Sequence, residues 1–491
     1  MNYRVTAYIL GQISVIMGAL MCIPLFMAVG YKEMGTAFGF GIAIAVAVAV
    51  GVIGILLRPS KDKRELRPSS GLIMCGLAWI LLSLISAIPF CLSNYIPHYI
   101  DALFETISGF TTTGASILSD VEALPRSLLF WRALTQWIGG MGVLVFIIAI
   151  MPKNDKASTA LAKAEMTGSQ FGKLVSKMRF TTQILYAMYI VLTLILVGIL
   201  CACKMPVFDS FCHAFSTAST GGFSVKNASI AAYDSVAIEV VITIFMILFS
   251  INFNVFYMIL IGRAIKALRN EEVTWFMIIY VVVVAAITTS LCVSKTYNSV
   301  AEALRYASFN VASVMSTTGY GTADFVTWPV LTQVLLLGVM CVGGCAGSTA
   351  GGMKVSRGII LCKSSILNVK KTMSPRSVYT LKMDGKPIGE DTVRNVQSFF
   401  ILYILIIVIS TILISIEGAV GDSITGFETN FSAVISAINN IGPGIGAVGP
   451  TGNYGDYGVF SKIVLCLDML LGRLEILPIL IIFYPKAWKK S

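Results

Sequence analysis

The chain of 491 residues is 56% hydrophobic and only 12% charged, with a mean hydropathy of +0.83. Such a composition cannot surround a globule with a water-facing surface, so a soluble protein is excluded and a polytopic membrane protein is expected. The net charge of +11 comes from basic residues clustered in alternate loops. This distribution argues against a nucleic-acid partner and, by the positive-inside rule, places those loops in the cytoplasm. Two histidines without an HExxH motif exclude a zinc hydrolase, and eleven cysteines without CxxC spacing are expected to be buried apolar residues.

Two apolar runs, residues 8–29 and 36–57, open the chain and are predicted to form a pair of transmembrane helices. The first run lacks a small-residue cleavage site and is followed by another span, so we expect a retained helix and not a signal peptide. A basic loop over residues 58–67 returns the chain to the membrane. This N-terminal unit is assigned to residues 1–70.

Four copies of one pattern follow, each with a span, a short helix, a phrase ending in glycine and a second span. The predicted repeats cover residues 71–177, 178–272, 273–390 and 391–491. Their spans are expected at 71–92, 128–151, 180–202, 236–261, 275–293, from 329, 398–416 and 458–484, and their short helices at 100–110, 209–218, 300–315 and 427–437. The predicted fold is an all-α polytopic membrane protein, with four M1-P-M2 pore repeats in a pseudo-fourfold arrangement plus two N-terminal transmembrane helices.

The four phrases recur about every hundred residues, and each follows its short helix directly. They are Thr111, Thr112, Thr113 and Gly114; Ser219, Thr220, Gly221 and Gly222; Ser316, Thr317, Thr318 and Gly319; and Asn439, Asn440, Ile441 and Gly442. Non-helical backbone at membrane depth is tolerated only inside protein or beside a watery cavity, so four re-entrant loops need a common centre. There they can form rings of carbonyl oxygens that replace the water around a cation. Glycine permits the positive φ that such a loop needs. One phrase alone would indicate an ordinary turn, but four in register favour an ion filter.

A glycine-rich stretch, residues 343–352, interrupts the second span of the third repeat, where a helix would lose about 1 kcal/mol per glycine. Its small residues are Gly343, Gly344, Gly347, Ser348, Thr349, Gly351 and Gly352. We expect an intramembrane gate loop that crosses beneath the filter. The alternative is a kink that lets helices pack closely.

Arg473 is predicted near the middle of the last span, where a charge costs about 2.5 to 3.5 kcal/mol and faces protein or water. The functional interpretation is that Arg473 projects into the pore below the filter and raises the barrier for a cation. The alternative is an ion pair with another helix, for instance through Asp468.

The motifs together resemble the potassium transporters of the Trk, Ktr and HKT superfamily. The resemblance rests on Thr-Thr-Gly-Ala at 112–115, Thr-Gly-Gly-Phe at 220–223, Thr-Thr-Gly-Tyr at 317–320, Asn-Ile-Gly-Pro at 440–443, the glycine-rich sequence at 343–354 and Gly-Arg-Leu-Glu at 472–475. The two extra N-terminal spans are similar to those of the bacterial TrkH branch and differ from KtrB, which lacks them. Glycine at all four filter positions favours potassium over sodium in this family.

The resemblance implies potassium-selective uptake across a bacterial inner membrane, with K⁺ as the transported ion bound at the filter residues and no organic cofactor. It also implies a homodimer and a cytosolic, nucleotide-binding regulatory subunit of the TrkA type. The basic stretches 153–177 and 363–386 are candidate contact surfaces for that subunit or for anionic lipid. A sodium- or proton-coupled cation symporter of the same fold stays open as an alternative.

Two other classes of membrane protein fit the sequence less well. A membrane-embedded enzyme would need convergent acids, histidines or a nucleophile within the spans, and the intramembrane charges are too few. A secondary transporter with inverted repeats also has broken, glycine-rich helices, but its repeats alternate in orientation, whereas these four enter from the same side.

Overall fold

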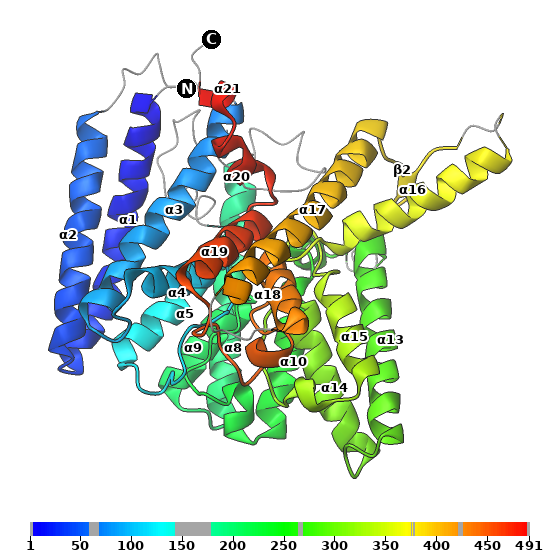
Figure 1. Ribbon diagram of the computed structural model, residues 1–491, viewed down its shortest axis with the longest axis horizontal. Helices are drawn as coiled ribbons and strands as arrows, with labels where there is room; N and C mark the ends of the chain where they lie inside the picture. The colour runs from blue at the N-terminus through cyan, green and yellow to red at the C-terminus, as the bar shows by residue number, and fades with distance from the viewer. Residues whose placement is uncertain are drawn as a thin grey trace.

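The computed structural model describes residues 3–57, 68–142, 178–263, 269–374, 376, 379–420 and 426–488. Within these residues the protein is built from helices, with a single short two-stranded hairpin (Figure 1). Six of the described helices are long and apolar enough to span a membrane, and a bent pair makes a seventh candidate. The prediction of an all-α polytopic membrane protein is confirmed.

The N-terminal pair consists of α1 (Tyr3–Gly30) and α2 (Met34–Leu56), which stand together at one side of the molecule (Figure 1). Glycines allow their close packing, since a Cβ on Gly11 would lie 2.9 Å from the Cα of Gly54. In the turn between the two helices, Glu33 accepts hydrogen bonds from the N–H groups of Arg126 (2.9 Å) and Ser127 (3.2 Å). These two residues begin α5 (Arg126–Gly140) of the first repeat, so Glu33 caps that helix and docks the N-terminal pair onto the repeats.

Each repeat starts with a long helix, followed by a short helix that ends at its glycine phrase. The first repeat has α3 (Pro68–Leu92), α4 (Tyr99–Phe110) and α5 (Arg126–Gly140); the second has α8 (Met178–Ala202), α9 (Val207–Ala218), α10 (Val236–Ser250) and α11 (Phe253–Leu260). The third has α13 (Glu271–Val293), α14 (Val300–Met315), α15 (Val330–Met340) and α16 (Val355–Met373). The fourth has α17 (Glu390–Val420), α18 (Phe427–Asn439), α19 (Val459–Arg473), α20 (Leu477–Ile482) and α21 (Pro485–Trp488). Short 3₁₀ turns at Ser229–Tyr233, Phe325–Thr327 and Gly446–Val448 lie in the loops after the phrases.

The prediction of uninterrupted second spans is wrong for the second and fourth repeats, whereas the third repeat has the interruption expected at its glycine-rich stretch. The expected span 236–261 bends by 93° between α10 and α11, where the Asn252 side chain accepts a hydrogen bond from the N–H of Asn254 and starts a new helix. The span expected from 329 ends at Met340, and that expected over 458–484 breaks after Arg473. For the span expected over 128–151, residues beyond 142 lie outside the described part of the chain.

A hairpin formed by β1 (Lys382–Met383) and β2 (Lys386–Pro387) follows α16. Its two turn residues, Asp384 and Gly385, have φ values of +51° and +74°, as a tight hairpin turn requires. Asp384 accepts hydrogen bonds from the N–H of Glu271 (2.8 Å) and from the Asn270 side chain (3.2 Å). The hairpin is therefore tied to the start of α13.

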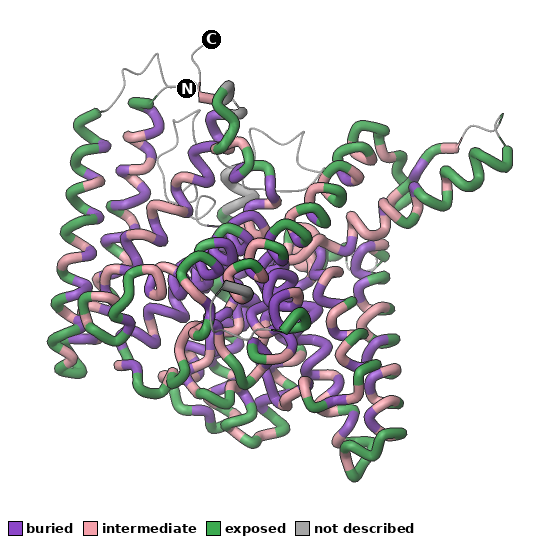
Figure 2. Tube along the Cα trace, viewed as in Figure 1, coloured by how far each residue is buried: buried purple, intermediate pink, exposed green. Residues whose placement is uncertain are grey.

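The buried residues concentrate around the short helices at the centre of the molecule, whereas the outer faces of the long helices are exposed (Figure 2). These outer faces are apolar: Val281 and Val282 of α13, for example, are 57% and 60% exposed. An exposed apolar surface of this extent suits lipid and not water. The polar phrases of the sequence lie inside, where the four repeats meet.

Candidate ion pathway

The four glycine phrases end their short helices with one backbone geometry. In each, the N–H of the residue before the last glycine donates to a carbonyl five residues upstream: Thr113 to Ser108 (2.9 Å), Gly221 to Ser216 (2.8 Å), Thr318 to Ser313 (2.9 Å) and Ile441 to Ser436 (3.0 Å). This bond is the long bond of a Schellman motif, which needs one left-handed residue. That residue is Thr112, Thr220, Thr317 or Asn440, with φ between +53° and +59°.

The last glycine of each phrase is left-handed as well. The φ values are +80° at Gly114, +78° at Gly222, +82° at Gly319 and +100° at Gly442. Each phrase thus has two left-handed residues separated by one other, a conformation that lets neighbouring carbonyl groups point the same way. Threonine, which is β-branched, adopts it only under strain, typically about 1–3 kcal/mol per residue.

The phrases meet in a closed ring. A Cβ added to any of the four glycines would clash with a carbonyl group of the next phrase. On Gly114 it would lie 3.2 Å from the carbonyl carbon of Gly221, and on Gly222 it would lie 2.9 Å from that of Thr318. On Gly319 it would lie 3.1 Å from the carbonyl carbon of Ile441, and on Gly442 it would lie 2.8 Å from the carbonyl oxygen of Thr113. Each glycine therefore abuts the residue before the glycine of the next repeat, and the fourth repeat returns to the first. The structure brings all sixteen predicted filter residues together, and the glycines are required because the ring leaves no room for a side chain.

Side chains inside and outside the phrases hold this ring in place. Gln136 of α5 donates to the Gly221 carbonyl (2.6 Å) and accepts from the N–H of Phe223 (3.1 Å). Asn440 donates to the Thr113 hydroxyl (3.0 Å), which links the fourth phrase to the first. The Gly442 carbonyl accepts from Ser436 (2.8 Å) and Tyr454 (2.7 Å). The ring is consequently not fourfold in its hydrogen bonding, because the Gly221 and Gly442 carbonyls already have protein donors.

Two series of supporting residues were not predicted from the sequence. A serine stands six residues before the last glycine in every repeat: Ser108, Ser216, Ser313 and Ser436. Buried polar residues nine positions before the glycine bind the chain that follows the phrase in three repeats: Glu105 accepts from Ser116 (3.0 Å), the His213 ring lies 3.1 Å from the Ser224 hydroxyl, and Asn310 donates to Thr322 (3.2 Å). Both series are visible in the sequence when the four copies are aligned on their last glycines.

The charge arrangement of the short helices favours a cation. All four helices carry an acidic residue in the first turn, at Asp101, Asp209, Glu302 and Glu428, and none has a basic residue in the last turn. Their C-terminal ends, which carry partial negative charge, all lead into the ring. Among the residues that the structure describes, no three His, Cys, Asp or Glu side chains come together as a metal site. A cation in the ring would therefore be bound by backbone and hydroxyl oxygens.

The outer loops are tied by polar contacts. Asn227 donates to Asp120 (2.8 Å), and Lys226 pairs with Glu122 (2.8 Å). The hydrogen bond from Asn227 lowers the pKa of the Asp120 carboxyl, and that from Lys226 lowers the pKa of Glu122. Both carboxylates are therefore charged at neutral pH.

The glycine loop (residues 343–352) lies directly against two of the phrases. The N–H of Gly351 donates to the Thr317 hydroxyl (2.7 Å), and a Cβ on Gly351 would lie 3.3 Å from the carbonyl carbon of Asn439 and clash with its oxygen. Gly343, Gly347 and Gly352 have φ values of +72°, +76° and +78°. The loop could not follow this course with other residues at these positions.

The same loop is docked on the break between α10 and α11. The N–H groups of Cys345 and Thr349 donate to the carbonyls of Ser250 (3.0 Å) and Phe249 (3.3 Å), and that of Phe253 donates to Gly347 (3.1 Å). The bend that sequence analysis missed thus supplies the backbone groups to which the loop binds. The loop is therefore held in place by backbone hydrogen bonds to both sides of this break.

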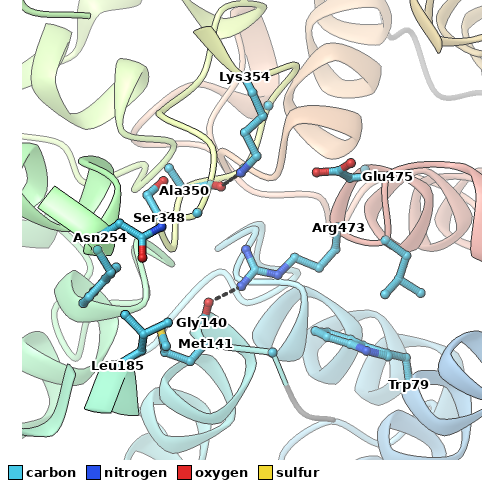
Figure 3. Close-up of a pocket in the computed structure, with 17 residues that line it drawn as sticks. Trp79, Gly140, Met141, Leu185, Asn254, Ser348, Ala350, Lys354, Arg473 and Glu475 are labelled. Carbon is cyan, nitrogen blue, oxygen red and sulfur yellow. Dashed lines mark hydrogen bonds between the residues drawn. The ribbon is translucent and has the colours of Figure 1, made fainter. Parts of the chain in front are cut away.

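Arg473 is the last residue of α19 and not the middle of a continuous helix, which corrects the predicted position. The helix ends there because Glu475 and Ile476 adopt φ values of +55° and +69°. The guanidinium donates to the carbonyls of Thr349 (2.9 Å), Gly139 (2.6 Å) and Gly140 (2.6 Å). It therefore bridges the glycine loop and the C-terminal end of α5, whose last carbonyls favour a cation (Figure 3).

Two acids near Arg473 in the sequence, the predicted partner Asp468 and also Glu475, have contacts of their own. Asp468 accepts a hydrogen bond from Ser410 (2.8 Å), and Glu475 pairs with Arg357 of α16. Arg473, Lys354 and Ala350 line a cavity of about 140 Å³ between the loop and the end of α5 (Figure 3). A second cavity, of about 810 Å³, lies beside the loop and is lined by α11, α13 and α16. Of the predicted gate residues, Gly347, Ser348, Gly351, Gly352 and Arg473 line the smaller of these two cavities.

Comparison with known proteins places the chain among membrane transporters. Residues 39–490 match the TrkH family, described as cation transport protein. The Trk system potassium uptake protein TrkH of Salmonella typhimurium is 34% identical over 495 residues, which cover both chains in full. TrkG of Escherichia coli K12, also a Trk system potassium uptake protein, is 33% identical over 491 residues, or 99% of each chain.

The crystal structure of the potassium transporter TrkH from Vibrio parahaemolyticus matches over the full length of both chains, with a TM-score of 0.88 and 31% sequence identity. The predicted resemblance is confirmed, as are the multi-pass location in a bacterial membrane and the prediction that the protein is not an enzyme. This chain belongs to the TrkH family of cation transport proteins.

Proposed function

We propose that the protein takes up potassium ions through the ring of four glycine phrases. The observation that carries this proposal is the contact of each phrase glycine with the next phrase, from Gly114 round to Gly442. Four helix C-termini directed at this ring stabilise a positive charge, and carbonyl and hydroxyl oxygens replace its water. The relatives named above are potassium uptake proteins, which supports potassium as the ion.

Under this proposal, the ion-binding residues are those of the four phrases: 111–114, 219–222, 316–319 and 439–442. The buried hydroxyls of these residues stiffen the ring, since Thr111 and Thr113, like Ser316 and Thr318, lie 2.7 Å apart at their oxygens. Selectivity for potassium over sodium then depends on a ring that does not contract around the smaller ion.

We propose further that the glycine loop and Arg473 form the gate. The loop lies against Thr317 and Asn439 of the ring, and Arg473 holds it through the Thr349 carbonyl. A positive charge 4 Å from a passing cation repels it by about 4 kcal/mol at an effective dielectric constant of 20. Conduction therefore requires that the loop and Arg473 move aside together.

The test is flux through the purified protein in liposomes, with rubidium and sodium tracers, together with growth of potassium-uptake-deficient cells. Rubidium uptake that exceeds sodium uptake supports the proposal, and equal uptake of the two refutes selectivity. The reversal potential separates the mechanisms: it follows the potassium gradient alone for passive flux. A shift with pH or with the sodium gradient would instead establish the sodium- or proton-coupled symporter.

The assembly partners belong to the proposal as well. We infer a homodimer that binds a cytosolic nucleotide-binding subunit of the TrkA type, because the chain belongs to a family whose relatives are components of a Trk system. The basic stretch 153–177 lies outside the described residues, whereas within 363–386 Lys363 pairs with Glu271. Light scattering of the purified protein, alone and with that subunit, decides both points, and a monomer that binds no subunit would refute them. Retention of anionic lipid during purification tests the lipid contact.

A further inference from the structure

Glu272, in the first turn of α13, contacts the glycine loop at Ala346, five residues before the Gly351 that contacts the ring. One of its carboxylate oxygens accepts hydrogen bonds from the N–H of Ala346 (2.7 Å) and from the N–H of Ser356 (3.1 Å). Ala346 lies within the loop and Ser356 in the first turn of α16, so one side chain connects the loop to the helix that follows it. The residue is buried, with 4% of its surface exposed.

The bonds of Glu272, like the bond from Arg473 to the Thr349 carbonyl, join the loop to a charged group. The bonds to Ser250, Phe249 and Thr317 join neutral groups, whereas those to Glu272 have a carboxylate acceptor. Hydrogen bonds to an ionised group are about twice as strong as neutral ones. A carboxylate also suits the N-terminus of α16, where the Ser356 N–H has no partner within the helix.

The larger cavity lies on the same side of the loop as Glu272. Glu272, Ala346, Gly347 and Ser356 are among the residues that line its volume of about 810 Å³. The loop therefore has space to enter when the Ala346 bond breaks. In contrast, the side that faces the ring is packed against Asn439 and Thr317.

We propose that Glu272 is a positioning residue of the gate, whose carboxylate holds the glycine loop beneath the ring. Loss of the bond to Ala346 releases the loop toward the larger cavity and opens the ion path. This inference rests on the proposed function of the loop as a gate, but the position of the loop can be measured without measuring flux.

Cys345 reports the position of the loop. It precedes Ala346 and has no exposed surface. Its rate of alkylation by N-ethylmaleimide, resolved peptide by peptide with mass spectrometry, measures how often the loop is released. Cys362 of α16, which is exposed, and Cys212 of α9, which is fully buried, serve as internal references in the same molecule.

Two variants remove the bond from its two ends. Glu272→Ala removes the acceptor, and Ala346→Pro removes the donor. Residues 345–348 form a type II turn, because the N–H of Ser348 donates to the Cys345 carbonyl (3.3 Å) and Gly347 has a φ of +76°. Residue 346 is the second residue of this turn, the position that proline prefers, so proline fits there. Glu271→Gln is the matched control, since Glu271 lies one position away and pairs with Lys363.

We expect both variants to raise the alkylation rate of Cys345 about tenfold or more, as expected for the loss of a hydrogen bond to a charged group, with the control unchanged. Rubidium flux should rise in parallel. If the alkylation rate of Cys345 is unchanged in both variants, the proposed role of Glu272 is refuted. It is also refuted if that rate rises equally in the Glu271→Gln control. Faster alkylation of Cys345 without a greater rubidium flux supports Glu272 as the residue that positions the loop, but it refutes the loop as the gate. If Glu272→Ala also exposes Cys212, it is misfolded, and the result for Ala346→Pro then decides.

Discussion

Replacement of Gly222 by alanine tests the ring at one contact. The new Cβ would clash with the Thr318 carbonyl of the next repeat and lie 2.9 Å from its carbon, closer than the 3.0 Å that real Cβ atoms respect. The Thr318 carbonyl must therefore shift, by an amount on the order of 1 Å, whereas a binding site tolerates about 0.5 Å. A positive φ adds about 1–2 kcal/mol for any residue with a Cβ, and overpacking adds about 1–3 kcal/mol.

Gly262 provides a matched control for the backbone cost. Its φ of +77° nearly equals the +78° of Gly222, and a Cβ there would have no neighbour within 4 Å. Gly262→Ala should therefore lower stability by about 1–2 kcal/mol through the backbone alone and leave the ratio of rubidium to sodium flux in liposomes unchanged. Gly222→Ala should lower stability further and reduce that ratio at least severalfold. The reasoning is refuted if both variants show the same flux ratio, because the ring contact would then have no bearing on selectivity.

Three further predictions follow from single contacts. Arg473→Ala removes both a charge beside the proposed ion path and the hydrogen bond to the Thr349 carbonyl, so rubidium flux should rise about tenfold or more. Unchanged flux in a folded variant would contradict the role of Arg473 in the gate. Gln136→Leu removes both hydrogen bonds to the second phrase region, which should lower stability by about 1–3 kcal/mol and admit more sodium. A ratio of sodium to rubidium flux equal to that of the parent protein would contradict a role of Gln136 in selectivity. Glu33→Ala uncaps α5 and should lower stability by about 1 kcal/mol, seen as a lower thermal midpoint, with Lys32→Ala in the same turn as control; equal midpoints would exclude the cap.

The ring can be predicted from the sequence because each phrase ends in a glycine. Gly114, Gly222, Gly319 and Gly442 stand at equivalent positions, and glycine is the residue that a left-handed backbone and close chain contact select. The first left-handed residue of each phrase could not be predicted for Thr112, Thr220 and Thr317, since threonine avoids this conformation. Of the four residues at this position, only Asn440 is of a type that tolerates the left-handed conformation and therefore indicates it in the sequence.

The helix breaks were harder to predict, because tertiary contacts determine them. The run around Asn252 is apolar on both sides, so hydropathy indicates one span, yet the backbone bends there and binds the glycine loop. The end of α19 at Arg473 depends on left-handed Glu475 and Ile476, positions that carry neither glycine nor proline, although Pro478 stands at the start of the next helix. Both breaks lie at the proposed gate, where local preference is expected to yield to function.

Anomalous diffraction from crystals grown in rubidium tests the central claim most directly. The account predicts a rubidium peak inside the ring bounded by Gly114, Gly222, Gly319 and Gly442, at contact distance from oxygen atoms of the phrases and lost in Gly222→Ala. Crystals of transport-competent protein with rubidium bound only outside this ring would contradict it.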